Sequence, residues 1–350
     1  MEENIITKPT KMVKIIFWLI LGLLSVFFAE VVSGSYMFPL FDIWGIFVII
    51  PIYTLHIILL SYIIFNYGKP VFYTLFIAGA IFGMYEAYLT KVLWSPTWGD
   101  PLISLAGIAV IELIVLVFFW HPFMAFIIPL FISETLFTGS RGVYNGLPSG
   151  FRDILKPGLK NRFLLISAVT FFGMVQSTNS PSALRSILSW ISIGTVIILL
   201  VCLLQQRTKG RNYDMRQLLP DTREFKVLLA VLIGMYLVMG IGMRPQALPG
   251  LMPQVIIWTL YLFLFILLHR SLRGGVGEIL PVDSSEMIKH SWKLIIGLYV
   301  LFTSASVISE LLFGSIGNTI MLVSWIFWCI IGLITLYRSV GYILRNDSTC

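Results

Sequence analysis

The chain consists of long apolar segments separated by short polar connections. A helix needs about 20 apolar residues to cross the hydrocarbon core of a bilayer, and this sequence supplies such segments repeatedly. The segments span residues 12–32, 43–65, 71–90, 102–137, 163–178, 183–206, 226–243, 251–269, 293–313 and 319–337. The pattern predicts an all-α integral membrane protein with about ten transmembrane helices.

The composition agrees with this prediction. Hydrophobic residues make up 58% of the 350 residues and charged residues only 12%, whereas soluble domains carry about 25% charged residues. No room remains for a soluble catalytic or nucleic-acid-binding domain. Cys202, Cys329 and Cys350 are too few and too dispersed to form a disulfide framework. We expect the lipid bilayer as the main partner, together with a membrane protein or a second copy of this chain, and no nucleic acid.

Basic residues alternate between the two sides of the predicted spans. If the N-terminus is cytoplasmic, every Lys and Arg except Lys91, Arg185 and Arg244 falls on the cytoplasmic side. Such a bias is typical of multi-pass proteins, whose inner loops are rich in Lys and Arg. The sequence therefore predicts a plasma-membrane protein with both termini in the cytoplasm, and the net charge of +7 reflects this topology.

The segment 102–137 is long enough to cross the membrane twice, and Pro122 and Pro129 are places where a helix can break. Two crossings would place the basic residues of 141–162 outside. One kinked crossing keeps them inside, so we favour it. We expect residues 101–112 to lie in the outer interface or to re-enter the membrane.

The spans divide into two units. Residues 1–137 form a four-span unit, and residues 163–337 form a six-span unit of three hairpins. Residues 138–162, which are basic and rich in Gly and Pro, form a cytoplasmic linker loop between them. Residues 338–350 form a cytoplasmic tail.

Ionisable residues at span depth are the main functional signal, because each costs roughly 2.5 kcal/mol or more near the bilayer centre. Nearly all of them lie in the first unit, as Glu30, His56, Glu86, Glu112, His121 and Glu134, while the second unit has Glu310. A structural interpretation remains open for several of them. Glu30, Glu112 and Glu310 could lie near the outer interface, where a charge costs little. The two histidines could be neutral and hydrogen-bonded within the bundle.

Glu86 is the sharpest candidate. Gly79, Gly83 and Glu86 share one helix face at i, i+4 and i+7, and small residues on such a face let another helix come close. The carboxylate should therefore point into the bundle, where Lys91 or His56 is the available partner. We select Glu86 and His121 as candidate catalytic residues, and His56, Glu30 and Glu134 as a candidate path for substrate or ions.

A metal site is a second interpretation of the same residues. Two histidines and a carboxylate can hold zinc, but His56, Glu86 and His121 come from three different spans and lack the HExxH spacing. The metal and the cofactor stay unknown at this stage.

The candidate residues lie in recognisable motifs. Residues 28–35 read FAEVVSGS, residues 79–86 read GAIFGMYE, and His121 is followed by Pro129 and by ETLF at 134–137. These strings resemble an uncharacterised family of prokaryotic multi-pass membrane proteins. That family usually has two glutamates where this chain has Tyr85-Glu86, and an Arg-Glu pair where it has Ser61-Tyr62.

The order of a glutamate and then a histidine on successive spans is also faintly similar to the CAAX-protease-like intramembrane metalloproteases. Their motif has two adjacent glutamates followed by an arginine, and a later helix with Phe three residues before a histidine. This chain keeps Glu86, lacks the arginine, and has Phe118 three residues before His121.

Three functions of different classes follow. The first is a transporter or permease with a Glu/His polar site inside the membrane. The second is a membrane-embedded enzyme, such as a metal-dependent hydrolase or a lipid-modifying enzyme. The third is a non-catalytic subunit of a membrane complex that binds its partner through loops 138–162 or 207–226.

Overall fold

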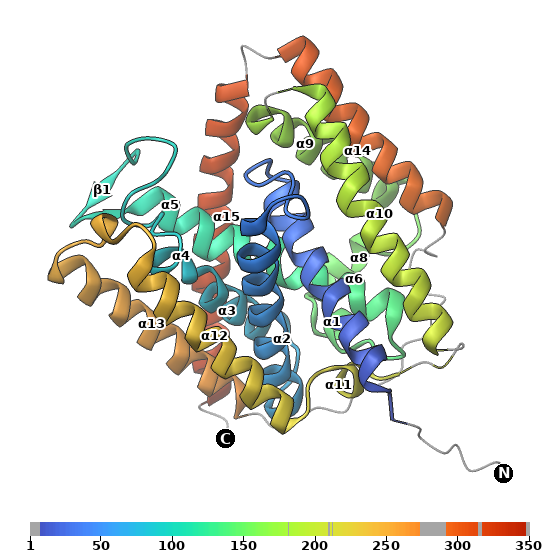
Figure 1. Cartoon of the computed structure of the whole chain (residues 1–350), viewed down its shortest axis with the longest axis horizontal. Coiled ribbons are helices and arrows are strands. Elements are labelled where there is room, and N and C mark those ends of the chain that lie inside the picture. The colour runs from blue at the N-terminus through green and yellow to red at the C-terminus, as the bar shows by residue number, and fades with distance from the viewer. Residues whose placement is uncertain are drawn as a thin grey trace.

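The computed structural model describes residues 8–180, 182–208, 211, 213–273, 292–313 and 317–347, and most of them are helical (Figure 1). The elements of the first half are α1 (Lys11–Val26), η1 (Phe27–Val31), η2 (Gly45–Ile49), α2 (Ile50–Tyr67), α3 (Phe72–Gly83), α4 (Tyr85–Tyr88), β1 (Ser104–Leu105), β2 (Ile108–Ala109), α5 (Val110–Val115), η3 (Leu116–Ile127), α6 (Ile128–Phe137), α7 (Gly142–Gly146) and α8 (Ser149–Ile154). Those of the second half are α9 (Leu159–Asn179), α10 (Ala183–Thr208), α11 (Met215–Leu218), α12 (Thr222–Gly242), η4 (Pro245–Ala247), α13 (Leu251–Leu272), α14 (Trp292–Phe313) and α15 (Gly317–Asp347).

The helices confirm an all-α membrane protein. Within the described residues, 7 helices are long and apolar enough to cross a bilayer, and residues 296–312 of α14 form a shorter apolar helix. The other two predicted spans correspond to α9, which begins with a polar stretch, and to α3 with α4. The third span is interrupted at Met84, so neither of its pieces is long enough alone.

The fourth span is one continuous helix from Val110 to Phe137, as the single-crossing interpretation predicts. It begins later than the predicted residue 102, because residues 104–109 instead form a small antiparallel hairpin in which Ser104 pairs with Ala109. The helix does not break at Pro122. Its middle section, η3, widens to π geometry, and such segments are frequent at functional sites.

The first four spans occupy the interior of the molecule. α1 packs on α2, and α3 packs closely on η3. The helices of the second half lie around them: α10 against α1, α12 against α2, α13 against α3, and α15 against both α3 and η3 (Figure 1). Among the candidate spans, α12 is the most exposed. Only 6% of the residues in its apolar stretch are buried, compared with 72% in the fourth span.

The two sides of this bundle differ. The side where α1 begins and α2 ends is termed proximal, and the side where η1 ends and η2 begins is termed distal. The proximal half of the four inner spans is filled by phenylalanine rings with no exposed surface, namely Phe17, Phe65, Phe76 and Phe126. The distal half contains the polar side chains described below.

Some predicted segments differ in detail from the structure. The predicted linker 138–162 contains the short helices α7 and α8, and α15 continues through most of the predicted tail 338–350. The placement of both chain ends in the cytoplasm concerns residues 1–7 and 348–350, which lie outside the described residues.

Candidate functional site

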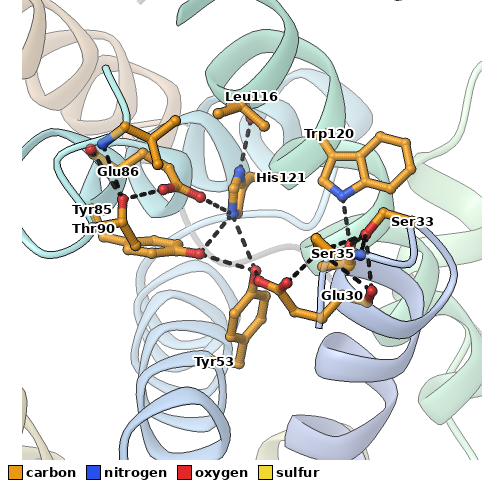
Figure 2. Close-up of polar contacts among 12 residues, drawn as sticks. Glu30, Ser33, Ser35, Tyr53, Tyr85, Glu86, Thr90, Leu116, Trp120 and His121 are labelled. Atoms are coloured by element: carbon orange, nitrogen blue, oxygen red, sulfur yellow. Dashed lines mark hydrogen bonds and ion pairs between the residues drawn. The ribbon is translucent and has the colours of Figure 1, made fainter. Parts of the chain in front are cut away.

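Five side chains from the four inner spans meet in the distal half of the bundle (Figure 2). They are Glu30 in η1, Tyr53 in α2, Tyr85 and Glu86 in α4, and His121 in η3. We refer to these five residues as the Glu30–Glu86 network. The structure therefore brings together three of the five residues selected from the sequence.

Tyr53 is the central residue of the network. Its hydroxyl donates to Glu30 Oε1 at 2.5 Å, lies 3.0 Å from the Tyr85 hydroxyl, and lies 3.5 Å from His121 Nε2. The only proton of Tyr53 is used toward Glu30, so the Tyr85 hydroxyl is free to donate to Tyr53 or to His121. The two carboxylates are thereby linked through groups that can both give and accept protons.

His121 is held in one tautomer. Its Nδ1 lies 2.9 Å from the carbonyl oxygen of Leu116, which only accepts, so we assign the proton to Nδ1. Nε2 of the neutral ring then carries a lone pair, and it faces the Tyr85 hydroxyl at 3.3 Å and Glu86 Oε1 at 3.6 Å. The ring is therefore oriented to accept a proton inside the network.

Glu86 is 7% exposed, and its second carboxylate oxygen accepts a hydrogen bond from the Thr90 hydroxyl. The prediction that Lys91 or His56 is its partner is wrong. The Lys91 ammonium donates to the carbonyl of Met243. Lys91 has a positive φ of 62°, so the chain turns sharply after Thr90 and carries the ammonium away.

His56 lies one helical turn from Tyr53 and outside the network. Its Nδ1 is 2.8 Å from the carbonyl of Ile52 and its Nε2 is 2.9 Å from the Tyr236 hydroxyl. The ring stacks on Phe82, with centroids 4.7 Å apart. Both ring nitrogens are thus bonded outside the network, although the His56 ring lies 5.8 Å from the ring of Tyr85, measured between centroids.

The positions of His56, Glu86 and His121 test the prediction that they could hold a metal ion together. Among the residues that the structure describes, no three His, Cys, Asp or Glu side chains lie together in a group that could hold a metal ion. A zinc site with three protein ligands does not fit the arrangement of His56, Glu86 and His121.

Two irregular helices carry the network. Glu30 lies in the π-helix η1 and His121 in the π-helix η3. The carbonyl of Ala29 in η1 accepts a hydrogen bond from Trp120 Nε1 at 2.8 Å, and Ser33 also donates to it. Side chains thus satisfy backbone groups that the irregular geometry frees, which lipid could not do.

Glycines bring the third span against the fourth. A Cβ on Gly79 would lie 2.4 Å from Pro122 Cα, and one on Gly83 would lie 3.0 Å from His121 Cβ. The prediction of a close helix contact on this face is therefore confirmed. The contact sets Glu86 beside His121, since both residues lie at the distal end of the same interface.

The remaining acidic candidates lie apart from the network. Both carboxylate oxygens of Glu134 accept from the backbone N–H of Val143, so Glu134 holds the start of α7 on the proximal side. Glu112 is 1% exposed near the hairpin, and Glu310 lies in α14; within the described residues each has one buried oxygen without a hydrogen-bond partner.

Two cations lock the distal ends of α4 and α12 together. Lys91 donates to the carbonyl of Met243, and Arg244 Nη1 donates to the carbonyl of Thr90 at 3.0 Å. Arg244 also reaches the Ser95 carbonyl at 2.9 Å. Burial lowers the pKa of Lys91, and the charge of Arg244 lowers it further. This reciprocal pair holds Thr90, and hence Glu86, in place.

Sequence reasoning missed Tyr53, Tyr85 and Thr90. The tyrosines blend into the apolar pattern of their spans, although Tyr85 adjoins Glu86 and Tyr53 lies three residues before His56. A polar atom on an otherwise apolar ring is the signal that could have found them, because buried tyrosine hydroxyls usually find a partner.

Comparison with known proteins agrees with this architecture. A family model described as an uncharacterized membrane protein family matches residues 19–344. The chain belongs to this family. A relative from Archaeoglobus fulgidus, described only as an uncharacterized protein, is 37% identical over 257 residues, which cover 73% of this chain and 77% of the relative. No solved structure matches the chain.

Proposed function

We propose that this protein is a proton-coupled membrane transporter whose coupling site is the Glu30–Glu86 network. The observation that carries the proposal is the linkage of two carboxylates on different spans through Tyr53, Tyr85 and His121, by contacts of 3.6 Å or less. Ionisable groups inside the membrane are costly and mark proton relays and ion pathways.

The irregular helices support the same function. In many transporters, the substrate and the coupling ion bind where transmembrane helices are discontinuous. Here Glu30 and His121 lie in π-helices, and Glu86 follows the interruption of the third span at Met84. Residues that move protons and a backbone that departs from α geometry therefore coincide.

The asymmetry of the bundle supports a site that opens to one side at a time. Glu30 is bonded to Ser35, which is exposed on the distal side, whereas the buried phenylalanines close the proximal half. We propose that the distal side faces the outside of the plasma membrane, as the distribution of basic residues predicts. In the transport cycle, rearrangement of the proximal half would then expose the network to the cytoplasm.

The test is proton movement in proteoliposomes that enclose the pH-sensitive dye pyranine. Amino acids, sugars, carboxylic acids and amines are added outside, one class at a time. The wild type should acidify or alkalinise the interior with one class, and Glu86→Gln should abolish that change. Glu112→Gln, which removes a buried carboxylate outside the network, should retain it. Retained proton movement in Glu86→Gln would overturn the proposal.

A membrane-embedded hydrolase is the second candidate, and the adjacency of Glu86 and His121 favours it. A carboxylate and a histidine at this separation can act as general base and general acid once a substrate tightens the geometry. The two functions differ in a simple way: a hydrolase needs no proton gradient, so collapsing the gradient with an uncoupler would leave its turnover unchanged.

A further inference from the structure

A run of aromatic side chains, partly buried at its start and exposed further on, follows Glu30 in the chain. Phe38, Phe41, Trp44 and Phe47 follow one another at intervals of three residues, and we refer to them as the aromatic stripe. Phe41 is 70% exposed and Phe47 is 68% exposed. Large apolar groups exposed together mark contact with lipid, with a ligand or with another protein.

The stripe continues a lipid-facing surface. Phe47 belongs to η2, which runs without interruption into α2 as one candidate span, Gly45–Tyr67. An exposed ring on that span faces hydrocarbon, so the rings that precede it extend the same surface to the end of the span. Trp, which occurs here as Trp44, is enriched at this depth in membrane proteins, where the lipid headgroups begin.

The stripe is connected to Glu30 by the intervening loop. Ser35 Oγ lies 2.5 Å from Glu30 Oε2, and the Tyr36 backbone N–H donates to the Glu30 carbonyl at 3.3 Å. Tyr36 then donates its hydroxyl to Asp42, at 2.6 Å, within the stripe. A molecule that leaves the lipid along the stripe therefore meets Ser35 and then Glu30.

The charges beside the stripe are acidic. Hydrogen bonds from the Tyr36 hydroxyl and the Gly45 backbone lower the pKa of Asp42, so it is ionised at neutral pH. In the part of the chain that the structure describes, the ion pairs of Lys and Arg side chains include neither Asp42 nor Glu30. The rings of Tyr53 and Tyr85 lie just behind Glu30.

We propose that Glu30 binds the cationic head of an amphiphile that enters from the lipid along the aromatic stripe. Two acidic groups and aromatic faces attract an organic ammonium group, and the same groups repel a carboxylate or phosphate head. The apolar chain of the amphiphile lies against the stripe. This inference names the substrate class of the proposed transporter and rests on that function.

Binding is measured by calorimetry on the full-length protein in lipid nanodiscs, with dodecyltrimethylammonium as the probe. Partition into protein-free nanodiscs is subtracted. Wild type and Glu112→Gln should bind it saturably, and Glu30→Gln should weaken binding by about tenfold or more, because a charged contact is lost. Dodecanesulfonate should show partition alone. Equal affinity in Glu30→Gln, or saturable binding of the sulfonate, would overturn the proposal.

A second measurement does not depend on how Glu30→Gln folds. Phe41→Cys, in a variant whose three cysteines are replaced, is labelled with bimane. Lipids that carry a doxyl group near the headgroup should quench the label, and aqueous iodide should not. The reverse result would place the stripe in water and contradict entry from the lipid.

The outcomes also separate this inference from the proposed function. If proton movement depends on Glu86 but dodecyltrimethylammonium does not bind, only the substrate class is wrong. If the amphiphile binds through Glu30 while Glu86→Gln moves protons normally, the coupling role of the network is wrong and the amphiphile site stands.

Discussion

The four inner spans and the helices that surround them are similar in composition but different in construction. The surrounding helices are regular, and much of their apolar surface faces outward, as for α12 with its 6% buried stretch. Within the described part of the chain, the inner spans contain π-helices, an interrupted helix and nearly all the buried ionisable groups. Irregular backbone and buried charge are therefore tolerated where protein, and not lipid, forms the surroundings.

Replacing one phenylalanine by alanine in the inner spans and one in the surrounding helices should give the largest contrast between the two regions. Phe76 is 0% exposed and Phe163 is 69% exposed. Phe76→Ala should lower the free energy of unfolding by roughly 3 kcal/mol or more, because it leaves a cavity among the proximal rings, and Phe163→Ala should change it little. Reversible unfolding in mixed detergent micelles measures both. Equal losses of unfolding free energy in the two variants would contradict the division into inner spans and surrounding helices.

Replacing one glycine by alanine in the inner spans and one in the surrounding helices should show the next largest effect. Gly79→Ala places a Cβ against the backbone of Pro122 and should cost about 1–3 kcal/mol. Gly234→Ala in α12 meets nothing within 4 Å and should be neutral or slightly stabilising. A neutral Gly79→Ala would show that the third and fourth spans are not in close contact.

Removing one side-chain bond to an irregular helix should have a smaller effect. Trp120→Phe loses the hydrogen bond to the Ala29 carbonyl and should cost about 1 kcal/mol. Trp44→Phe, at an exposed position of the aromatic stripe, is the control and should be neutral. Amide hydrogen exchange checks the cause: exchange in η1 should accelerate in Trp120→Phe and stay unchanged in the control.

The smallest expected effect is a pH dependence from Lys91. Its pKa in the folded protein is lowered from the usual 10.5 by burial and by Arg244. Between the lowered pKa and 10.5, the unfolded chain binds more protons at this residue, so the free energy of unfolding should rise with pH. Lys91→Met should remove this slope and the exposed Lys226→Met should keep it. An unchanged slope in Lys91→Met would assign it to another group.

The sequence predicted the helical class, most span boundaries and the orientation of Glu86, because hydropathy and the spacing of Gly79, Gly83 and Glu86 report directly on lipid contact and helix packing. It did not predict the partners of Glu86. The positive φ of Lys91 redirects its ammonium, and periodicity carries no information about such a turn.

The sequence also did not predict the π-helices. A π segment shifts the angular position of every residue that follows it, so an assumed period of 3.6 residues misplaces Glu30 and His121 relative to their neighbours. Tyr53 contacts these groups only because four spans converge. The sequence alone does not indicate which buried tyrosine lies where the spans meet.

Difference infrared spectroscopy across a pH titration tests the network most directly. The wild type in nanodiscs should show a protonated carboxyl band that disappears in Glu86→Gln, stays in Glu112→Gln and shifts in Tyr53→Phe, since the network couples Glu86 to Tyr53 through Tyr85 and His121. A Glu86 carboxyl band that ignores the loss of the Tyr53 hydroxyl would contradict a connected proton-binding site.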